Sequence, residues 1–534
     1  MNRKLNSVLW GGDKPGRAVT LGIQHVFAMF GSTVLVPALT GLDPAVTLFC
    51  MGIGTLIFHL ITKGMVPAFM GSSFAFIASI GAVATECANK GIDNFASYVG
   101  WGIMASGLLY VILAMLVKFL GAKRITSFFP PIVTGCMIII IGMMLAPTAM
   151  SNITSVQGDL AQGAIVTVIE GDVATDEFVK CSYIIDAKDK NDPADDVTIT
   201  GWLKSENLGL AADVAADTTN GIPAYENKDG RDYTVLCSDG VSLLNEASAD
   251  SSTLSGTAAW KNWVVAIVTI AAIVCVMFFV RGFFKLIPIL IGIIVGYLVS
   301  LALGIVDLSA VKSADIIHFP QFSLPAFENW GTVVYAITLI APISVVTFVE
   351  HVGDITANGA VTGHNYIEDP GLHRTLLGCG LASVFSGCMG APAATTYSEN
   401  TGVLAATRNY NPATLRIAAV FAIVLSMFGV VSGVLASIPA AVMGGVSVVL
   451  FGMIASVGLR MLVENQVDFT RSYNLIIAAV MLVVGLGMSG GLTIGGFTIS
   501  STAIAAVLGV ILAKILPHSD ADERAAAKKA ASKK

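Results

Sequence analysis

Charged residues are scarce in this chain of 534 residues, where Asp, Glu, Lys and Arg together make up only 12%. Hydrophobic residues account for 55% of the sequence, whereas a typical soluble domain carries about 25% charged residues. So little charge excludes a water-soluble fold. The composition instead predicts a protein that crosses a membrane many times.

Several sequence features that would indicate other functions are also missing. The seven histidines show no metal-like spacing with each other or with the eight cysteines, so we expect no metal site and no cofactor. No nucleophile–base pair and no cytoplasmic output domain are visible, which disfavours the alternatives of a membrane enzyme or a sensor. We also expect no nucleic-acid partner. The N-terminus, MNRKLNSVLWGGDKPGR, lacks a signal peptide's apolar core and cleavage site, so the first span is expected to direct insertion.

Fourteen apolar segments are spread along the chain, and they predict an all-α polytopic membrane protein with 14 transmembrane segments. Several are shorter than the ~20 residues that a straight spanning helix needs. The segments lie at roughly 18–38, 44–61, 67–84, 100–117, 131–149, 263–280, 286–305, 335–358, 374–390, 396–406, 413–434, 440–457, 473–488 and 498–516.

Basic residues indicate the orientation of these segments. Outside 151–258 the chain has 24 Lys and Arg, of which all but Lys90, Lys261 and Lys312 fall on one side of the predicted spans. The positive-inside rule then places both termini in the cytoplasm of a multi-pass cell-membrane protein. The expected organisation is 1–150 with segments 1–5, an insert at 151–258, 259–516 with segments 6–14, and a cytoplasmic tail at 517–534.

The insert has a different composition, with 19 acidic and 6 basic residues. Runs such as AIVTVIEG, FVKCSYIIDA, DVTITGWL and YTVLCSDG alternate as half-buried strands do. We therefore expect a small extracellular β-rich domain, with a disordered acidic loop as the alternative. Cys181 and Cys237 are its only cysteines, and a disulfide between them is one of two open possibilities in an oxidising space.

Two segments cannot be ordinary membrane helices. The stretch from Gly390 to Arg408, GAPAATTYSENTGVLAATR, is interrupted by proline and glycine and carries Glu399 in its middle. The segment at 67–84 is broken by Pro67 and Gly71. These are the third segments of two halves of seven, which predicts a 7+7 inverted repeat of the kind that secondary transporters use, with the substrate at the broken segments.

The candidate functional residues lie in or near these breaks. Glu350 and Asp354 are four residues apart and share one helix face, whereas His351 points elsewhere. An alternative interpretation of Glu350 is that it lies solvated at the end of a helix. An alternative interpretation of Glu399 is that it caps a half-helix starting near Asn400. His25 has the alternative of a buried structural histidine. Ser72 and Ser73 have the alternative of satisfying backbone groups that the broken helix frees.

These groups together suit a planar nucleobase. Carboxylates accept N–H donors, and the exposed amides at half-helix N-termini donate to carbonyl oxygens. Uracil offers two N–H and two C=O groups around one ring, and xanthine offers a similar edge on a larger ring. A carboxylate in a partly dry site also binds protons more readily, which suits proton coupling.

The sequence resembles the nucleobase–ascorbate transporter family, also called nucleobase:cation symporters, and most closely its bacterial uracil permeases. The most specific motif is the family signature, which reads Glu399-Asn400-Thr401-Gly402 followed by Thr407-Arg408. It is accompanied in the family's order by Gln24-His25, KGMVPAFMGSSFAFI, EHVGD, DPGLHR and MGGVS. The resemblance covers nearly all apolar segments and omits the insert.

This resemblance implies short β-strands in broken segments 3 and 10, a core and a gate domain, and a homodimer in the lipid bilayer. It also implies import of uracil, with a xanthine-type purine or a broader nucleobase as the alternative. Asp354 stands where a uracil permease has histidine, and Ser398 replaces a glycine. We assign substrate binding to Glu350, Glu399, Phe74, Ser398, Ser73 and Tyr397, and proton coupling to His25, Asp354 and Glu350.

Overall fold

The computed structural model of the chain separates into two compact units, Met1–Ala149 with Val268–Lys534 and Met150–Ile267. The structure describes 15–154 except 91, 93, 123, 125–127 and 129; it describes 159–160, 165–170, 173, 178–185, 197–205, 208–210, 232–235 and 241–242 in the insert, and 259–516 except 307, 313–316, 489–490 and 495–496.

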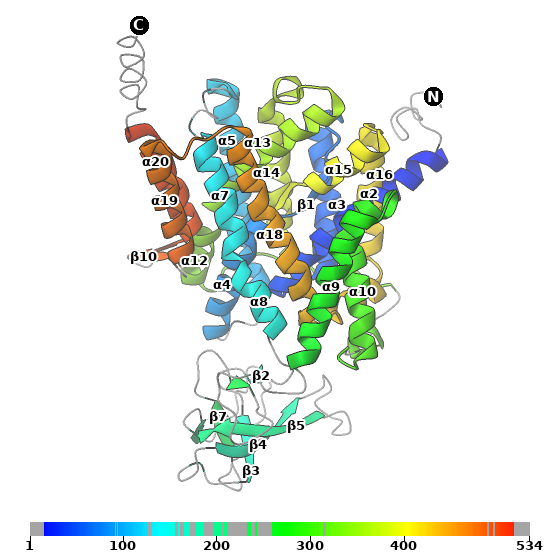
Figure 1. Cartoon of the computed structure of the whole chain (residues 1–534), viewed down its shortest axis with the longest axis vertical. Helices are drawn as coiled ribbons and strands as arrows, with labels where there is room; N and C mark the ends of the chain where they lie inside the picture. The colour runs from blue at the N-terminus through cyan, green and yellow to red at the C-terminus, as the bar shows by residue number, and fades with distance from the viewer. Residues whose placement is uncertain are drawn as a thin grey trace. The chain divides into compact units, whose positions relative to one another are not determined.

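The first unit is a bundle of helices that run side by side, with the short strand β1 among them (Figure 1). The unit boundaries fall within α8 and α9. The helices of the chain are α2 (Pro15–Thr40), α3 (Pro44–Ile61), η1 (Phe74–Phe76), α4 (Ile77–Asn89), α5 (Phe95–Leu120), α7 (Pro131–Met144), α8 (Ala146–Thr154), α9 (Ala259–Phe279), η3 (Phe283–Leu286), α10 (Pro288–Ala302), α11 (Ser309–Lys312), α12 (Trp330–Ile340), α13 (Ile343–Thr362), η4 (Ile367–Gly371), α14 (Leu372–Cys388), α15 (Ser398–Thr407), α16 (Pro412–Ser426), α17 (Gly429–Ala436), α18 (Ala440–Glu464), α19 (Ser472–Gly487) and α20 (Ser501–Ile515).

Proline starts several of these helices, as the fixed φ of proline and its missing N–H allow. Pro44 follows the N-cap Asp43, whose Oδ1 accepts from the amides of Ala45 and Val46. Pro412 follows the N-cap Asn411 in the same way. The helix boundaries therefore follow from local sequence.

Among the described residues, seven helices are long and apolar enough to cross a membrane, or eight if the bent pair α16–α17 forms one span. Each of the fourteen expected segments coincides with at least one helix. However, α4, α10, α15, α19 and α20 have only 10–16 residues. The fold is a multi-helix membrane bundle, and the count of fourteen crossings remains a prediction.

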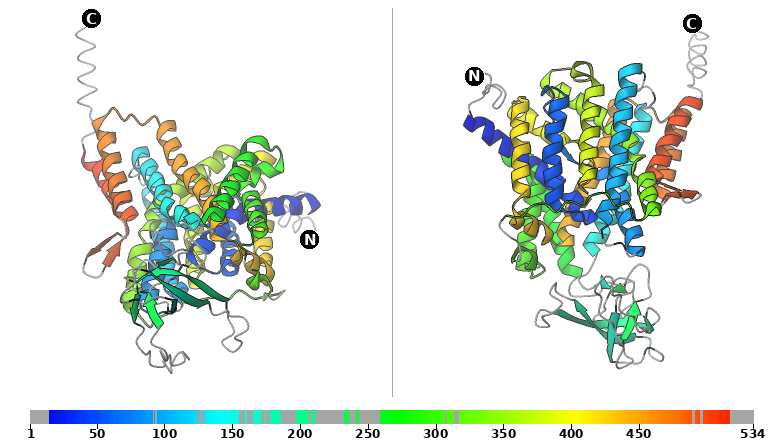
Figure 2. Two further views of the ribbon diagram at one scale, coloured as in Figure 1. Left: turned by 60° about the horizontal axis from the view of Figure 1, so that its bottom comes forward. Right: turned by 180° about the vertical axis from the view of Figure 1, so that it is seen from behind.

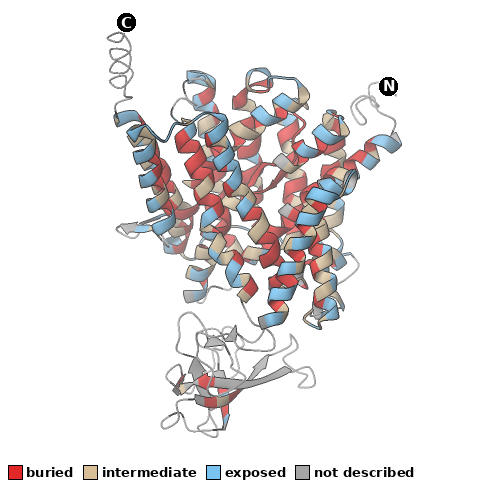
Figure 3. Cartoon of the chain, viewed as in Figure 1, coloured by how far each residue is buried: buried red, intermediate tan, exposed pale blue. Residues whose placement is uncertain are grey.

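Glycine pairs let α5 and α14 approach closely. A Cβ at Gly107 would lie 2.7 Å from the Gly380 carbonyl oxygen, and one at Gly387 would lie 2.6 Å from the Gly100 oxygen. Small residues at such contacts are the usual means of close packing between helices in membranes, where no hydrophobic force drives association. Figure 3 shows buried residues on the faces that helices turn toward one another and exposed residues on the outward faces.

The second unit contains a five-stranded antiparallel sheet in the order β5-β4-β3-β7-β6, seen from other directions in Figure 2. β3, β4, β5 and β7 coincide with the four runs that alternate in the sequence, whereas β6 lies outside them. Cys181 is buried on β4 as a free thiol, so the possible disulfide with Cys237, which lies outside the described residues, is not formed in this structure. The strands of this unit are β2 (Asp159–Leu160), β3 (Ile165–Glu170), β4 (Phe178–Ile185), β5 (Val197–Lys204), β6 (Leu208–Leu210), β7 (Asp232–Val235) and β8 (Val241–Ser242).

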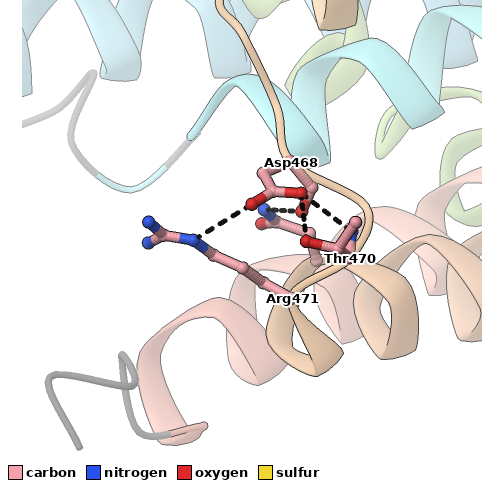
Figure 4. A network of polar contacts seen from close by, with 4 residues as sticks. Asp468, Thr470 and Arg471 are labelled. Atoms are coloured by element: carbon pink, nitrogen blue, oxygen red, sulfur yellow. Dashed lines mark hydrogen bonds and ion pairs between the residues drawn. The ribbon is translucent and has the colours of Figure 1, made fainter. Parts of the chain in front are cut away.

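The turn between α18 and α19 is organised by Asp468. Its Oδ1 accepts hydrogen bonds from the Thr470 amide at 2.9 Å and the Thr470 hydroxyl at 2.6 Å. Its Oδ2 lies 3.5 Å from Nε of Arg471 (Figure 4). The Thr470 hydroxyl is the main cause that holds the pKa of Asp468 below its usual value.

Candidate functional site

Two broken segments meet inside the bundle as a two-stranded ribbon. β1 (Met70–Ser72) pairs antiparallel with β9 (Ala394–Thr396), with Met70 opposite Thr396 and Ser72 opposite Ala394. All six residues are buried. Two further backbone bonds extend the ribbon, from the Tyr397 amide to the Phe69 carbonyl and from the Ser73 amide to the Ala393 carbonyl.

The outer edges of this ribbon receive hydrogen bonds from neighbouring helices. Thr55 of α3 accepts from the Met70 amide at 2.9 Å. Ser383 of α14 accepts from the Ala394 amide at 3.1 Å and donates to the Ala394 carbonyl at 3.0 Å. Irregular backbone at membrane depth is tolerated only where protein satisfies it, so these hydroxyls stabilise the break.

Ser72 satisfies a backbone carbonyl in α2 that a proline leaves without its usual partner. The N–H that would normally bond the Thr33 carbonyl in α2 belongs to position 37, which is a proline without an N–H. The Ser72 hydroxyl donates to this carbonyl at 2.9 Å. Ser72 thus satisfies a backbone carbonyl, as the structural alternative expected, but the carbonyl belongs to α2 and not to its own broken segment.

A helix begins directly after each strand of the ribbon. η1 starts at Phe74 and α15 at Ser398, and neither receives a side-chain cap hydrogen bond. Because the first N–H groups of a helix have no intrahelical acceptor, both starts present amide donors. The alternative in which Glu399 caps a half-helix starting near Asn400 is wrong: Tyr397 occupies the N-cap position, and Glu399 lies in the first turn. β9 pairs with β1 as far as Thr396, and α15 begins two residues later at Ser398, before the position expected in that alternative.

Two aromatic rings flank these helix starts. The rings of Phe74 and Tyr397 are nearly parallel at 8°, with centroids 6.5 Å apart. The Tyr397 hydroxyl donates to the Ser72 carbonyl at 2.8 Å. Its ring lies over Gly71, where an added Cβ would be 2.2 Å from the ring. Gly71 is therefore required because the tyrosine ring occupies the space of a side chain.

The carboxylates approach the same place from α13 and α15. α13 contacts α15, β9 and η1, and Glu350 interacts electrostatically with both Asp354 and Glu399. All three carboxylates are half-buried. Asp354 accepts from the Thr396 hydroxyl at 2.9 Å. The three acidic residues that the sequence singled out therefore form one cluster.

The remaining predicted residues lie close by. His25 on α2 is 1% exposed, and its Nδ1 is 3.4 Å from Nδ2 of Asn400 on α15. The Ser73 amide belongs to the ribbon extension, and its side chain is buried. Only the backbone of Ser398 is described, at the first position of α15.

One residue was not assigned a role from the sequence. The sequence analysis expected His351 to point away from Glu350 and Asp354, but its Nδ1 lies 3.4 Å from the Thr396 hydroxyl that also bonds Asp354. Its Nε2 is 2.9 Å from Oγ1 of Thr375. The polar sequence EHVGD was the available signal, but the link through Thr396 needs the tertiary structure.

Within the described part of the chain, no three His, Cys, Asp or Glu side chains are arranged to hold a metal ion. The arrangement instead offers carboxylate acceptors, backbone donors and two parallel ring faces. Such groups can bind a planar polar molecule by hydrogen bonds at its edge and by contact with its faces.

Comparison with known proteins gives consistent results. The sequence model of the Permease family matches residues 16–185 and 238–494. The unmatched stretch, 186–237, is narrower than the insert that the resemblance was expected to omit. The uracil permease of Bacillus caldolyticus is 37% identical over 508 residues, covering 95% of this chain and 94% of the relative. The uracil permease of Escherichia coli K12 is 31% identical over 499 residues, which cover 93% of this chain and 91% of that relative.

Solved structures share the fold at low identity. The transmembrane domain of a cyanobacterial bicarbonate transporter superimposes with a TM-score of 0.55 at 14% identity, covering 93% of this chain and 96% of that one. A murine anion transporter of the solute carrier 26 family superimposes with a TM-score of 0.55 at 11% sequence identity. The match covers 95% of this chain and 68% of the transporter. Because the family model and the full-length relatives agree with the motifs, the chain belongs to the permease family of nucleobase–ascorbate transporters.

Proposed function

We propose that this protein imports uracil across the cell membrane by proton symport. The observation that carries the proposal is the meeting of Glu350 and Glu399 beside the uncapped start of α15 and the ring of Tyr397. The relatives named uracil permeases support the same substrate.

Each group has a role in this proposal. Glu350 and Glu399 accept the two N–H groups of the pyrimidine, and the amides of Phe74 and Ser398 donate to its carbonyl oxygens. The ring faces of Phe74 and Tyr397 contact the planar base. His25 supports the position of α15 through Asn400. The site thus matches two donors and two acceptors on one flat molecule.

Alternative substrates are a broader range of pyrimidines or a xanthine-type purine. A putative pyrimidine permease of Escherichia coli K12 is 32% identical over 507 residues, which favours the pyrimidine alternative. An anion is disfavoured although the fold resembles that of anion transporters, because neighbouring carboxylates would repel it. A multi-pass homodimer in the lipid bilayer, with cytoplasmic termini, completes the proposal.

Proton coupling supplies the energy for uptake of a neutral base. Moving one charge across 100 mV releases ~2.3 kcal/mol, which corresponds to roughly a fiftyfold accumulation. Glu350, Asp354 and His25 are the proposed proton-handling groups. Uptake should rise at acidic external pH, collapse with a protonophore and need no sodium; sodium-dependent uptake that ignores the proton gradient would refute the coupling and leave the nucleobase site intact.

Binding of labelled uracil to the purified full chain tests the site. Glu350→Gln and Glu399→Gln should each weaken binding about tenfold or more, because a hydrogen bond to a charged group contributes ~1.5–3 kcal/mol. Glu464→Gln is the matched control, since Glu464 is an exposed carboxylate that pairs with Arg460. Unchanged affinity in both site variants would contradict the assignment, and competition by purines would identify the alternative substrate.

A further inference from the structure

Thr396 of β9 stands between Asp354 and His351. Its Oγ1 is 2.9 Å from Oδ2 of Asp354 and 3.4 Å from Nδ1 of His351. Thr396 is 4% exposed and His351 is 1% exposed, so the two side chains depend on protein partners. A hydroxyl carries one proton, and Thr396 can therefore donate to only one of the two neighbours at a time.

The other side of the imidazole determines which nitrogen carries its proton. Nε2 of His351 is 2.9 Å from Oγ1 of Thr375, and the same hydroxyl donates to the Leu372 carbonyl at 3.0 Å. Because Thr375 uses its proton for Leu372, the neutral imidazole donates from Nε2 to Thr375. Nδ1 then faces Thr396 as an acceptor.

A second donor reaches this nitrogen. Sγ of Cys379 lies 3.4 Å from Nδ1 of His351 and 3.9 Å from Sδ of Met70. The thiol is a weak donor that can turn to either atom. Nδ1 can therefore receive a proton donor from Thr396 or from Cys379.

These contacts allow two complete hydrogen-bond arrangements that differ by one proton on Asp354. When Asp354 is ionised, Thr396 donates to it and Cys379 donates to His351. When Asp354 is protonated, its O–H donates to Thr396, Thr396 donates to His351, and Cys379 turns to Met70. The Thr396 hydroxyl reverses direction between the two.

We propose that Thr396 is a positioning residue that transmits the protonation of Asp354 to the substrate site by reversing its hydroxyl between Asp354 and His351. Thr396 pairs with Met70 of β1 and immediately precedes Tyr397, so the direction of its hydroxyl is set next to the residues that follow the ribbon and carry the aromatic rings. The inference rests on the proposed proton-coupled transport. The titratable groups that face Asp354 are Glu350 and His351 on α13, Tyr110 on α5 and Cys379 on α14.

Thr396→Val tests this device because it removes the hydroxyl and keeps the branched shape. The ionised form of Asp354 loses a charge-assisted hydrogen bond, whereas the protonated form loses a weaker neutral one. The pH midpoint of uracil uptake into proteoliposomes should therefore move to higher pH by about one unit. Cys379→Ala should move it in the same direction by less, since a thiol is the weaker donor.

Two variants separate this role from a structural one. Thr396→Ser keeps a hydroxyl and should restore the midpoint. Thr356→Val removes an exposed α13 hydroxyl that bonds only along its own helix to the Val352 carbonyl and should leave the midpoint in place. A Thr396→Val midpoint that equals the wild-type value, or an equal shift in Thr356→Val, overturns the inference.

A second measurement does not depend on transport. The infrared carbonyl band of protonated Asp354, identified by its loss in Asp354→Asn, can be titrated in the purified full chain. Its midpoint should shift in Thr396→Val as uptake does. If the wild type transports no uracil, the proposed function fails, and this titration alone decides on the relay. If uracil is transported and the band does not shift, only the relay is wrong.

Discussion

Gly71→Ala should displace the Tyr397 ring and thereby disrupt the proposed substrate site. The added Cβ would lie 2.2 Å from Cε2 and Cζ of Tyr397 and 2.5 Å from Cε1, whereas ordinary contacts begin at 3.4 Å. The ring would therefore have to move by about 1 Å or more. Overpacking of this kind costs ~1–3 kcal/mol.

The displacement would also lengthen or break the hydrogen bond from the Tyr397 hydroxyl to the Ser72 carbonyl, which is 2.8 Å long. Leaving that donor buried without its partner costs a further ~1–3 kcal/mol. Since Tyr397 stacks with Phe74 and precedes Glu399 by two residues, we expect uracil affinity to fall at least tenfold, by about 1.4 kcal/mol or more.

Equilibrium binding of labelled uracil and thermal unfolding of the purified full chain provide the assay. Gly81→Ala is the matched control in the same broken segment, because no atom lies within 4 Å of a Cβ there. It should be neutral or gain up to ~1 kcal/mol of helix stability. Tyr397→Phe isolates the hydroxyl from the ring. Wild-type affinity and melting temperature in Gly71→Ala would refute the argument that the ring fills this space.

Two further predictions concern parts of the chain outside the site. Replacing roughly 155–256 with a short Gly/Ser linker should leave measurable uracil uptake, because the spans carry their own site; complete loss in a correctly inserted, folded protein would show that the insert participates. Asp468→Asn should lower the melting temperature at pH 7, because the folded state favours the ionised carboxylate through Thr470. Since the folded pKa is lowered, this stabilisation is present above the unfolded pKa of ~3.9 and is lost as pH falls through the folded value. The two proteins should then converge in acid, and a gap that stays constant to pH 2 would contradict the assignment.

Local sequence determined where the bundle breaks and which groups are polar there. Pro67, Gly71 and Pro392 interrupt apolar segments, and a carboxylate such as Glu399 is too costly at membrane depth unless it faces a partner or cavity. The spacing of Glu350 and Asp354 placed both on one helix face. The sequence could indicate these breaks, where the structure has β1 and β9, because composition and helical periodicity are properties of neighbouring residues.

Only the tertiary structure decided which distant groups meet. The pairing of Met70 with Thr396 joins residues more than 300 positions apart, and no local pattern encodes such a partner. With this pairing, α15 begins at Ser398, and the ring of Tyr397 lies against Gly71. It also brought Thr396 between Asp354 and His351, which are three residues apart on α13 and both reach its hydroxyl. A hydroxyl from another segment supplies the connection because packing, rather than sequence spacing, sets the distances at which hydrogen bonds form.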